Sequence, residues 1–507
     1  MAVGKQIKIG AILSYVHIIV GAIITFLFTP FMIRIMGKGD YGLYNTVASV
    51  ISSLSILSLG FGSSYVRFYI KYKEKDDEIM VHRLNGMFLI IFLIIGIVAF
   101  ICGFFLSQNL ELVFSNGLTQ TELEIAEKLM LLLAFNLAVS FPSSVFSSII
   151  TANERFIFQK ILLLVKQVAS PLISIPILLS GYGSYGIVLT TVVVNMFVDI
   201  VNMWFAIIKL NTRFLFDHFD KAVFKSIAVF SSFIAINMIV DQINLNIDKI
   251  LLGRFCGTSS VAVYSAGFLL YHYVQTFSTS ISNVFTPRTH KIWNSPTLSY
   301  TEKNRRLSET FGKVGRIQLL ILLLICSGLV LFGQQFILLW IGEGYQNSYY
   351  VVLLLALSAL VPLTQNVGIE IQRAKNKHKF RSILYAIMAL INLFLSIILC
   401  QLYAEVGSAI GTAISFIVAN TILMNIYYSK ELNIDISIYW KNFGRCVLGA
   451  TPAIIIGGVY CQIVDTYKLR TMIIGIILYS FIYLCSQFLI GTTKLEKLDL
   501  IHTVIKP

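Results

Sequence analysis

The chain has 507 residues, of which 57% are hydrophobic and only 13% are charged, and its mean hydropathy is +0.80. In soluble globular proteins charged residues make up about a quarter of the total, so this composition excludes a soluble globule. Seven cysteines stand singly, with no C-x-x-C pair or Cys/His cluster, so neither a disulfide framework nor a zinc site is indicated. The net charge of +14 has to be explained by topology or by a partner.

Apolar stretches of about 20 residues, the length that crosses a bilayer as a helix, follow one another from Ile9 to Ile490. The first run follows Lys5 and Lys8 but is too long for a signal peptide, so we expect a transmembrane helix there. The predicted fold class is an all-α polytopic membrane protein. Its fourteen predicted helices lie at 9–36, 43–70, 84–107, 125–152, 160–180, 186–208, 223–252, 258–285, 313–341, 349–372, 381–402, 407–429, 442–463 and 471–491.

Basic residues gather in alternate connections of this predicted topology. All but seven of the 39 lysines and arginines fall on the side that holds both termini. The positive-inside rule therefore predicts that both termini are cytoplasmic. The same asymmetry explains the net charge, because basic loops contact anionic lipid headgroups. Nucleic acid is not needed as a partner.

The sequence is internally duplicated. Arg34–Tyr44 recurs without a gap as Arg254–Tyr264 at a shift of 220 positions, and Ala152–Phe156 parallels Ala374–His378 at a shift of 222. Six helices separate the copies, so both halves start on the same side of the membrane, as in a parallel repeat. In such transporters the substrate path lies between the halves. The predicted domains are an N-lobe (1–215), a C-lobe (216–435) and a C-terminal pair of helices with a tail (436–507).

Several short motifs match a known family. They are the run Pro30–Tyr44 with Leu59-Gly60-Phe61-Gly62 and Val66-Arg67, the loop Ala152–Arg155, and the second-half run Asp248–Gly253 with Tyr264-Ser265. The chain thereby resembles polysaccharide repeat-unit flippases of the multidrug/oligosaccharidyl-lipid/polysaccharide exporter superfamily. The resemblance implies that two six-helix lobes alternate between inward- and outward-open states. It also implies a lipid-linked oligosaccharide substrate, typically on undecaprenyl pyrophosphate, moved from the cytoplasmic to the outer leaflet.

Polar side chains form stripes on three predicted helices. On the seventh helix the steps of 4, 3 and 4 residues place four of them within about 60° of one another. A charge near a helix centre costs about 2.5–3.5 kcal/mol, so such residues should face a cavity or a partner. A buried carboxylate there could carry a coupling ion. The alternative is that these groups pair across helix interfaces. The candidate cavity or ion-coupling residues are Asn237, Asp241, Asn244, Asp248, Asp199 and Glu370.

Four cations are candidates for binding the substrate. Arg34 and Arg254 occupy equivalent positions of the repeat. Guanidinium groups bind phosphate oxygens bidentately, so the pair is a candidate pyrophosphate clamp. Arg67 and Lys166 could extend it. The alternative for all four is interfacial anchoring, in which a long basic side chain reaches the headgroups from a helix end.

Three functions compete. A flippase ranks first. An ion-coupled multidrug exporter of the same superfamily ranks second, because acidic cavity residues suit cationic drugs. A membrane glycosyltransferase or polymerase ranks third, because the predicted outer loops are short. No G-x-x-x-x-G-K-[ST] motif is present, so ATP hydrolysis by this chain is not expected. We therefore predict a transporter rather than an enzyme, with no cofactor and no metal.

For the flippase, the expected partners are the lipid-linked oligosaccharide, anionic membrane lipids and the polysaccharide polymerase or glycosyltransferases of the same process. The expected location is the bacterial cytoplasmic membrane.

Overall fold

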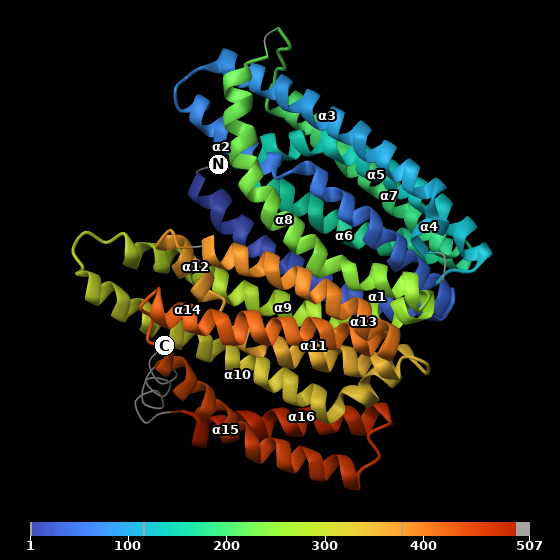
Figure 1. Cartoon of the computed structure of the whole chain (residues 1–507), viewed down its shortest axis with the longest axis vertical. Coiled ribbons are helices and arrows are strands. Elements are labelled where there is room, and N and C mark those ends of the chain that lie inside the picture. The colour runs from blue at the N-terminus through green and yellow to red at the C-terminus, as the bar shows by residue number, and fades with distance from the viewer. Residues whose placement is uncertain (1–2, 115–116, 218, 378, 493–507) are drawn as a thin grey trace. The chain divides into compact units, whose positions relative to one another are not determined.

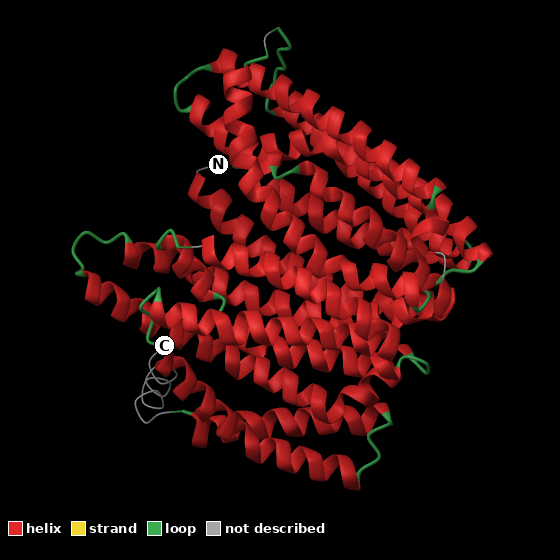
Figure 2. Cartoon of the chain, viewed as in Figure 1, coloured by secondary structure: helices red, strands yellow, loops and turns green. Residues whose placement is uncertain are grey.

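The computed structural model describes residues 3–492 other than 115–116, 218 and 378. All regular elements in this described part are helical, and it contains no strand (Figures 1 and 2). The chain forms two compact units, Met1–Ala262 and Val263–Pro507, which we call the N-unit and the C-unit. Their boundary falls in the N-terminal part of α9 (Thr258–Trp293). The predicted all-α class is confirmed.

The N-unit is a bundle of long helices connected by short loops. Within it α3 packs along α5, α5 along α7, and α1 along α6 and α8. Its elements are α1 (Val3–Ser53), the 3-10 turn η1 (Leu54–Ser58), α2 (Phe61–Lys73), α3 (Glu78–Gln108), α4 (Leu110–Phe114), α5 (Gln120–Ala152), α6 (Phe156–Leu179), α7 (Gly183–Trp204), the π-helical turn η2 (Phe205–Lys209) and α8 (Lys221–Phe255).

Polar side chains start several of these helices. Thr119 and Glu122 form a capping box at the start of α5, and Asp220 accepts hydrogen bonds from two backbone N–H groups at the start of α8. Such caps satisfy N–H groups that have no partner within the helix, and each contributes about 1 kcal/mol. They explain why the helices begin where they do.

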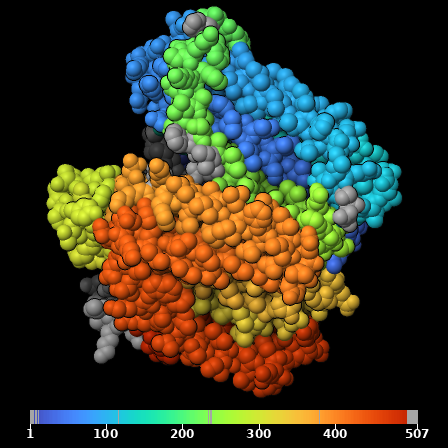
Figure 3. Space-filling model, viewed as in Figure 1, coloured from blue at the N-terminus to red at the C-terminus, as the bar shows by residue number. Residues whose placement is uncertain are grey.

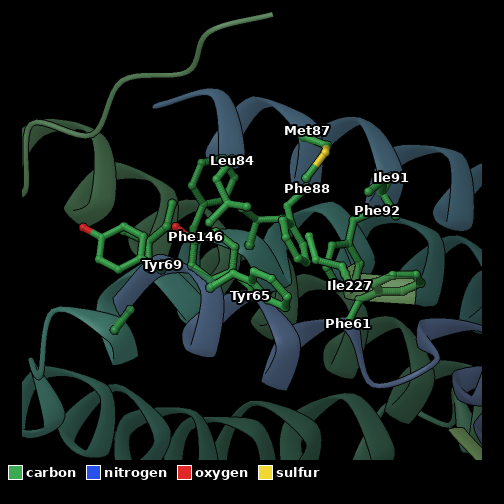
Figure 4. Close-up of a cluster of buried hydrophobic side chains, with 14 of the residues drawn as sticks. Phe61, Tyr65, Tyr69, Leu84, Met87, Phe88, Ile91, Phe92, Phe146 and Ile227 are labelled. Atoms are coloured by element: carbon green, nitrogen blue, oxygen red, sulfur yellow. The ribbon is translucent and has the colours of Figure 1, made fainter. Parts of the chain in front are cut away.

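An aromatic cluster holds α2 in the N-unit. Tyr65 is fully buried, and its ring meets Phe88 of α3 edge to face with 5.1 Å between centroids. Its hydroxyl donates a 2.6 Å hydrogen bond to Asn85. Figure 4 shows this cluster, in which Phe61, Tyr65 and Tyr69 of α2 lie against α3, with Phe146 of α5 and Ile227 of α8 beside them. The short helix α2 is therefore firmly packed.

The C-unit contains the remaining helices. α10 packs along α11 and α15, and α15 packs along α16. Its elements after α9 are α10 (Tyr300–Ile341), α11 (Gln346–Thr364), α12 (Val367–Ala374), α13 (Lys379–Phe416), η3 (Ile417–Leu423), α14 (Met424–Lys430), α15 (Ile436–Ile463), α16 (Leu469–Ser486) and η4 (Gln487–Gly491). The buried Arg316 of α10 donates a 2.6 Å hydrogen bond to the Gly491 carbonyl, which ties the C-terminal helices to α10.

Ten helical runs in the described part of the chain are long and apolar enough to cross a membrane. Two of them contain two predicted spans each: the 62-residue run Ile12–Lys73 and the 52-residue run Lys379–Lys430. A bilayer needs only about 20 residues, so each run has the length for two crossings. α8 and α9 are not among the ten. The predicted count of fourteen stays a prediction.

Several predicted boundaries differ from the observed ones. The predicted loop after residue 36 is a kink at Gly37 inside α1, with φ 77° and ψ 171°. The predicted span 43–70 is interrupted, since α1 gives way to η1 and α2 begins only at Phe61. The predicted span 349–372 is likewise divided into α11 and α12. The short helix α4 lies in the region that the sequence predicts as an outer loop.

Matching backbone conformations support the internal repeat. Gly37 and Gly257, 220 positions apart, have φ of 77° and 85°. Two further pairs at a shift of 222 are Glu154 and Asn376 (57° and 55°) and Asn211 and Asn433 (48° and 50°). Positive φ is uncommon outside glycine, so the two non-glycine pairs at the predicted shift favour two related halves, and the glycine pair agrees with them. The predicted domain boundaries themselves remain predictions.

Candidate functional site

The N-unit contains a helix that is interrupted inside the predicted span 43–70. Leu59 and Gly60 adopt left-handed φ of 48° and 71°, and they separate η1 from α2. A Cβ on Gly60 would lie 2.4 Å from Cγ2 of Ile234, so α8 approaches the break closely. Irregular backbone is tolerated within a membrane only where protein or a water-filled cavity surrounds it, and broken helices often form transporter binding sites. The break therefore marks a candidate site.

Arg67 lies two turns beyond the break on α2, and it contacts α8. Its guanidinium carbon is 4.3 Å from the ring centroid of Phe230. One turn earlier, the hydroxyls of Ser64 and Ser231 are 2.6 Å apart and form a buried hydrogen bond. Arg67 is exposed at its outer side. The structure thus places this candidate cation against the helix that carries the longest predicted polar stripe.

Lys166 and Asp199, predicted separately as a binding cation and a cavity acid, interact electrostatically. Lys166 lies on α6 and Asp199 on α7, and both are half-buried. Ser143 of α5 also interacts with the Asp199 carboxylate. Three neighbouring helices therefore contribute to one charged site inside the N-unit. Nearby, Asn195 donates a 3.1 Å hydrogen bond to Asn136.

The predicted stripe on α8 passes through different environments. Asp241 is exposed, Asn244 is half-buried and Asp248 is only 2% exposed. Asp248 interacts electrostatically with its neighbour Lys249. The side chain of Asn237 lies outside the described part of the structure. Asp241 is thus the carboxylate of this stripe that is open to solvent.

Arg34 and Arg254 have different surroundings. Arg34 is exposed, and no hydrogen bond or ion pair joins it to any residue that the structure describes. Arg254 is half-buried at the end of α8, where its Nη1 donates to the carbonyls of Leu112 and Val113 at 3.3 and 3.1 Å. These carbonyls belong to α4, so Arg254 supports that short helix. The structure does not show the two guanidinium groups as a matched pair.

Glu370 forms an ion pair with Arg373 and lies near His290. Its carboxylate lies 2.6 Å from Nη1 of Arg373 and 3.8 Å from Nε2 of His290, and its side chain is only 12% exposed. All three residues belong to the C-unit. This arrangement matches the alternative in which Glu370 is a structural pair.

A lysine in the connection between α12 and α13 contacts α9, α10 and the connection between α14 and α15. Nζ of Lys375 donates to Oδ1 of Asn304 and to the carbonyl of Leu432, and it lies 4.9 Å from the ring centroid of Trp293. Burial, reinforced by the nearby charge of Lys377, lowers the pKa of Lys375 to about 8. The equivalent position of the repeat, Asn153, accepts a 2.6 Å hydrogen bond from Lys73. Each unit therefore uses a Lys–Asn contact near the same loop.

An apolar pocket of about 500 Å³ lies in the C-unit. Its lining is almost entirely hydrocarbon and aromatic, and it comes from α9, α10 and α16. The residues that α16 contributes are Ile476, Tyr479 and Ser480. We call this pocket the apolar groove. Pockets of this size hold small ligands or parts of larger ones.

Sequence reasoning missed the helix break, the apolar groove and a basic pocket at the junction of α9 and α10. Apolar residues continue through the Leu59-Gly60-Phe61-Gly62 motif and hide the break. The groove joins segments about 200 positions apart, so no local pattern predicts it. The basic pocket could have been predicted from the long polar stretch between the predicted eighth and ninth helices.

Among curated proteins, the chain is similar to the probable low-salt glycan biosynthesis flippase Agl15 of Haloferax volcanii. The identity is 22% over 290 residues, which is 56% of this chain and 58% of that protein. The match thus spans less than two thirds of the relative's length.

Solved transporter structures resemble the whole fold. The lipid II flippase MurJ in an inward closed conformation matches with a TM-score of 0.74 and 17% identity, covering 97% of this chain and 100% of that one. An inward-facing multidrug resistance MATE family transporter of the MOP superfamily matches with a TM-score of 0.63 and 13% identity, covering 82% and 99%. At these identities the likeness concerns the fold.

The family comparison covers more than half of the chain. Residues 8–293 match the family described as polysaccharide biosynthesis protein. The resemblance drawn from the sequence motifs is thereby confirmed for family and fold. The chain belongs to the polysaccharide biosynthesis protein family, and it has the fold of the multidrug/oligosaccharidyl-lipid/polysaccharide exporter transporters.

Proposed function

We propose that the chain translocates a lipid-linked oligosaccharide repeat unit, carried on undecaprenyl pyrophosphate, from the cytoplasmic to the outer leaflet by alternating access. It would do so in the cytoplasmic membrane of a bacterium, with both termini in the cytoplasm and for assembly of a cell-surface polysaccharide. Family membership supports the process. The names of the similar flippases support the lipid-linked class of substrate.

The observation that carries this proposal is the apolar groove. α16, one of the two helices outside the predicted duplication, supplies part of its wall. A polyprenyl chain is hydrocarbon, so its transfer into such a groove is favoured by about 25 cal/mol per Å² of buried apolar surface. The appended helices therefore favour a lipid-linked substrate over a multidrug exporter.

For the polar part of the substrate we propose the N-unit cations. Arg34 is the guanidinium best placed to bind phosphate, because its side chain is exposed and forms no hydrogen bond or ion pair with described residues. Arg254 would have to exchange two backbone carbonyls for phosphate oxygens. Phosphate offers anionic oxygens in a bidentate geometry, whereas the carbonyls are neutral acceptors, which favours that exchange. Arg67 and Lys166 are the further candidates, and Asp199 and Asp241 are the proposed ion-coupling carboxylates.

A variant whose side chain fills the apolar groove tests this proposal. A Cβ on Gly328 would lie 3.7 Å from Tyr479, an ordinary contact, so Gly328→Phe should place its ring in the groove without moving backbone. The control is Gly444→Phe on α15, where nothing lies within 4 Å. We expect Gly328→Phe to slow translocation of a fluorescent undecaprenyl-pyrophosphate oligosaccharide in liposomes at least about tenfold, a barrier change of about 1.4 kcal/mol. Thermal unfolding of both variants checks that they fold. Equal translocation by folded Gly328→Phe and Gly444→Phe would refute the role of the groove.

A further inference from the structure

A second pocket, of about 730 Å³, opens in the C-unit where α9 ends and α10 begins. The hairpin that holds it is yellow-green in Figure 1, and its atoms lie on the surface of the C-unit in Figure 3. The less exposed part of its lining, which we call the floor, contains apolar side chains such as Phe285, Ile292 and Val314. The exposed part, which we call the rim, carries five cations, namely Arg288, Lys291, Arg305, Arg306 and Lys313, and one acid, Glu309. We call it the basic pocket.

Helical spacing explains why these residues meet. On α10, Arg306, Thr310 and Lys313 are separated by 4 and 3 residues, so they lie within about 60° on one face. On α9, Arg288 and Ile292 are likewise one turn apart. Both helices therefore contribute basic and apolar side chains to one pocket.

Two of the five cations are already paired. Arg305 lies 2.9 Å from Glu302 and 2.6 Å from Glu309, and Arg306 lies 2.6 Å from Glu302. The three remaining cations, Arg288, Lys291 and Lys313, are exposed and form no hydrogen bond or ion pair with any described residue. The basic pocket thus keeps an uncompensated positive charge, which is the electrostatic requirement for an anion site.

The sequence predicts that the pocket lies at the depth of lipid headgroups. Lys313 stands four residues before the apolar run that starts at Ile317, a distance of about 6 Å along the helix axis. Basic residues at this level on the cytoplasmic side interact with anionic lipid. The predicted topology places this end of α9 and α10 on that side.

We propose that the basic pocket binds the phosphate group of a membrane lipid, with Arg288 and Lys313 as its main ligands. The guanidinium of Arg288 offers a fork of N–H donors and the ammonium of Lys313 a point charge. The apolar floor accommodates the glycerol or isoprenyl part beside the phosphate. This site is separate from the N-unit cations, and it does not depend on whether the chain is a flippase.

Binding by the full-length chain in phosphatidylcholine nanodiscs tests the proposal. The probes are phosphatidylglycerol, undecaprenyl pyrophosphate and inorganic pyrophosphate, each followed by native mass spectrometry. The pocket variant is Arg288→Gln/Lys313→Gln. The control, Lys441→Gln/Arg445→Gln, removes the same charge from exposed positions of α15. We expect the pocket variant to bind one or both lipid probes at least about tenfold more weakly than the parent, because it loses two charge-assisted hydrogen bonds. The control should stay within about twofold, since it loses only diffuse charge.

The probes identify the source of the phosphate. Weaker binding of phosphatidylglycerol identifies a bulk phospholipid, and weaker binding of undecaprenyl pyrophosphate identifies a polyprenyl lipid; either supports the site. A defect confined to inorganic pyrophosphate would overturn the assignment to a lipid. Equal losses in the pocket and control variants would show that only general charge matters, and would overturn the site itself. Because no transport is measured, these outcomes are independent of the proposed flippase activity.

Discussion

At the scale of single residues, Lys375 gives a prediction about pH. Its pKa is about 8 in the folded chain, against 10.5 for an exposed lysine. Below pH 8 the amine is protonated in both the folded and the unfolded chain, and burying its charge lowers the free energy of unfolding by the full amount. Between pH 8 and 10.5 the unfolded chain holds more protons, so the free energy of unfolding rises with pH across this window.

The measurement is the melting temperature in detergent from about pH 7.5 to about pH 10, which covers most of this window. At the lowest pH of this range Lys375→Met should be less stable than the parent, because Asn304 and the Leu432 carbonyl lose their hydrogen-bond donor. Relative to this variant, the parent should gain stability as the pH rises. Lys441→Met, at an exposed position, should keep the parent's slope. Parallel pH curves for the parent and Lys375→Met would contradict the prediction.

The Lys166–Asp199 interaction gives a second residue-scale prediction. Replacing one member of a partly buried charge pair leaves the other uncompensated, whereas replacing both does not. The losses of unfolding free energy caused by Lys166→Gln and by Asp199→Asn should therefore add up to more than the loss caused by the double variant. The expected coupling is about 0.5–3 kcal/mol in a double-mutant cycle of unfolding. Strictly additive effects would mean that the two charges do not act on each other.

At the scale of elements, the break before α2 requires a glycine at position 60. Gly60 has φ 71°, and a Cβ there would lie 2.4 Å from Ile234. Gly60→Ala should cost about 1–3 kcal/mol of stability, because it adds both backbone strain and a clash. Gly62→Ala is the matched control, since its Cβ would meet only Ser148 Oγ at 3.6 Å. A melting temperature for Gly60→Ala equal to that of the control would show that a side chain at this position causes neither backbone strain nor a clash.

The long helices could be predicted from hydropathy, because a run of about 20 apolar residues has the length of a membrane span and exceeds most core segments of soluble proteins. The interruption at Leu59 could not, since a leucine in the left-handed region has no local signature in the sequence. The repeat was detectable because Gly37 and Gly257 meet the same backbone requirement in both halves. Local composition therefore predicts the spans and the duplication, but not where a span is broken.

The candidate site was predicted less completely than the fold. Polarity alone selected Lys166 and Asp199, which do interact, but it also selected Glu370, which is held by Arg373 and His290. Sequence spacing cannot distinguish these cases, because the partner of a charged side chain comes from another helix. The groove and the basic pocket depend on such packing as well.

At the scale of the whole molecule, the positive-inside asymmetry gives a topology that can be tested. Single cysteines placed at Lys441 and at Lys468 should lie on opposite sides of the membrane, since α15 connects them and the predicted topology makes it a span. The expected result is labelling of the Lys468→Cys variant in intact cells by a membrane-impermeant maleimide. Lys441→Cys should react only after the cells are opened. The reverse pattern would invert the proposed direction of transport.

The central claim is that the chain moves a lipid-linked sugar. The most direct measurement uses the purified chain in liposomes that contain a fluorescent undecaprenyl-pyrophosphate oligosaccharide, and follows its protection from a membrane-impermeant quencher. Parallel liposomes contain a cationic dye in place of the lipid. We predict translocation of the lipid-linked sugar and no dye efflux. Dye efflux without translocation of the lipid would contradict the claim, and would assign the chain to drug export.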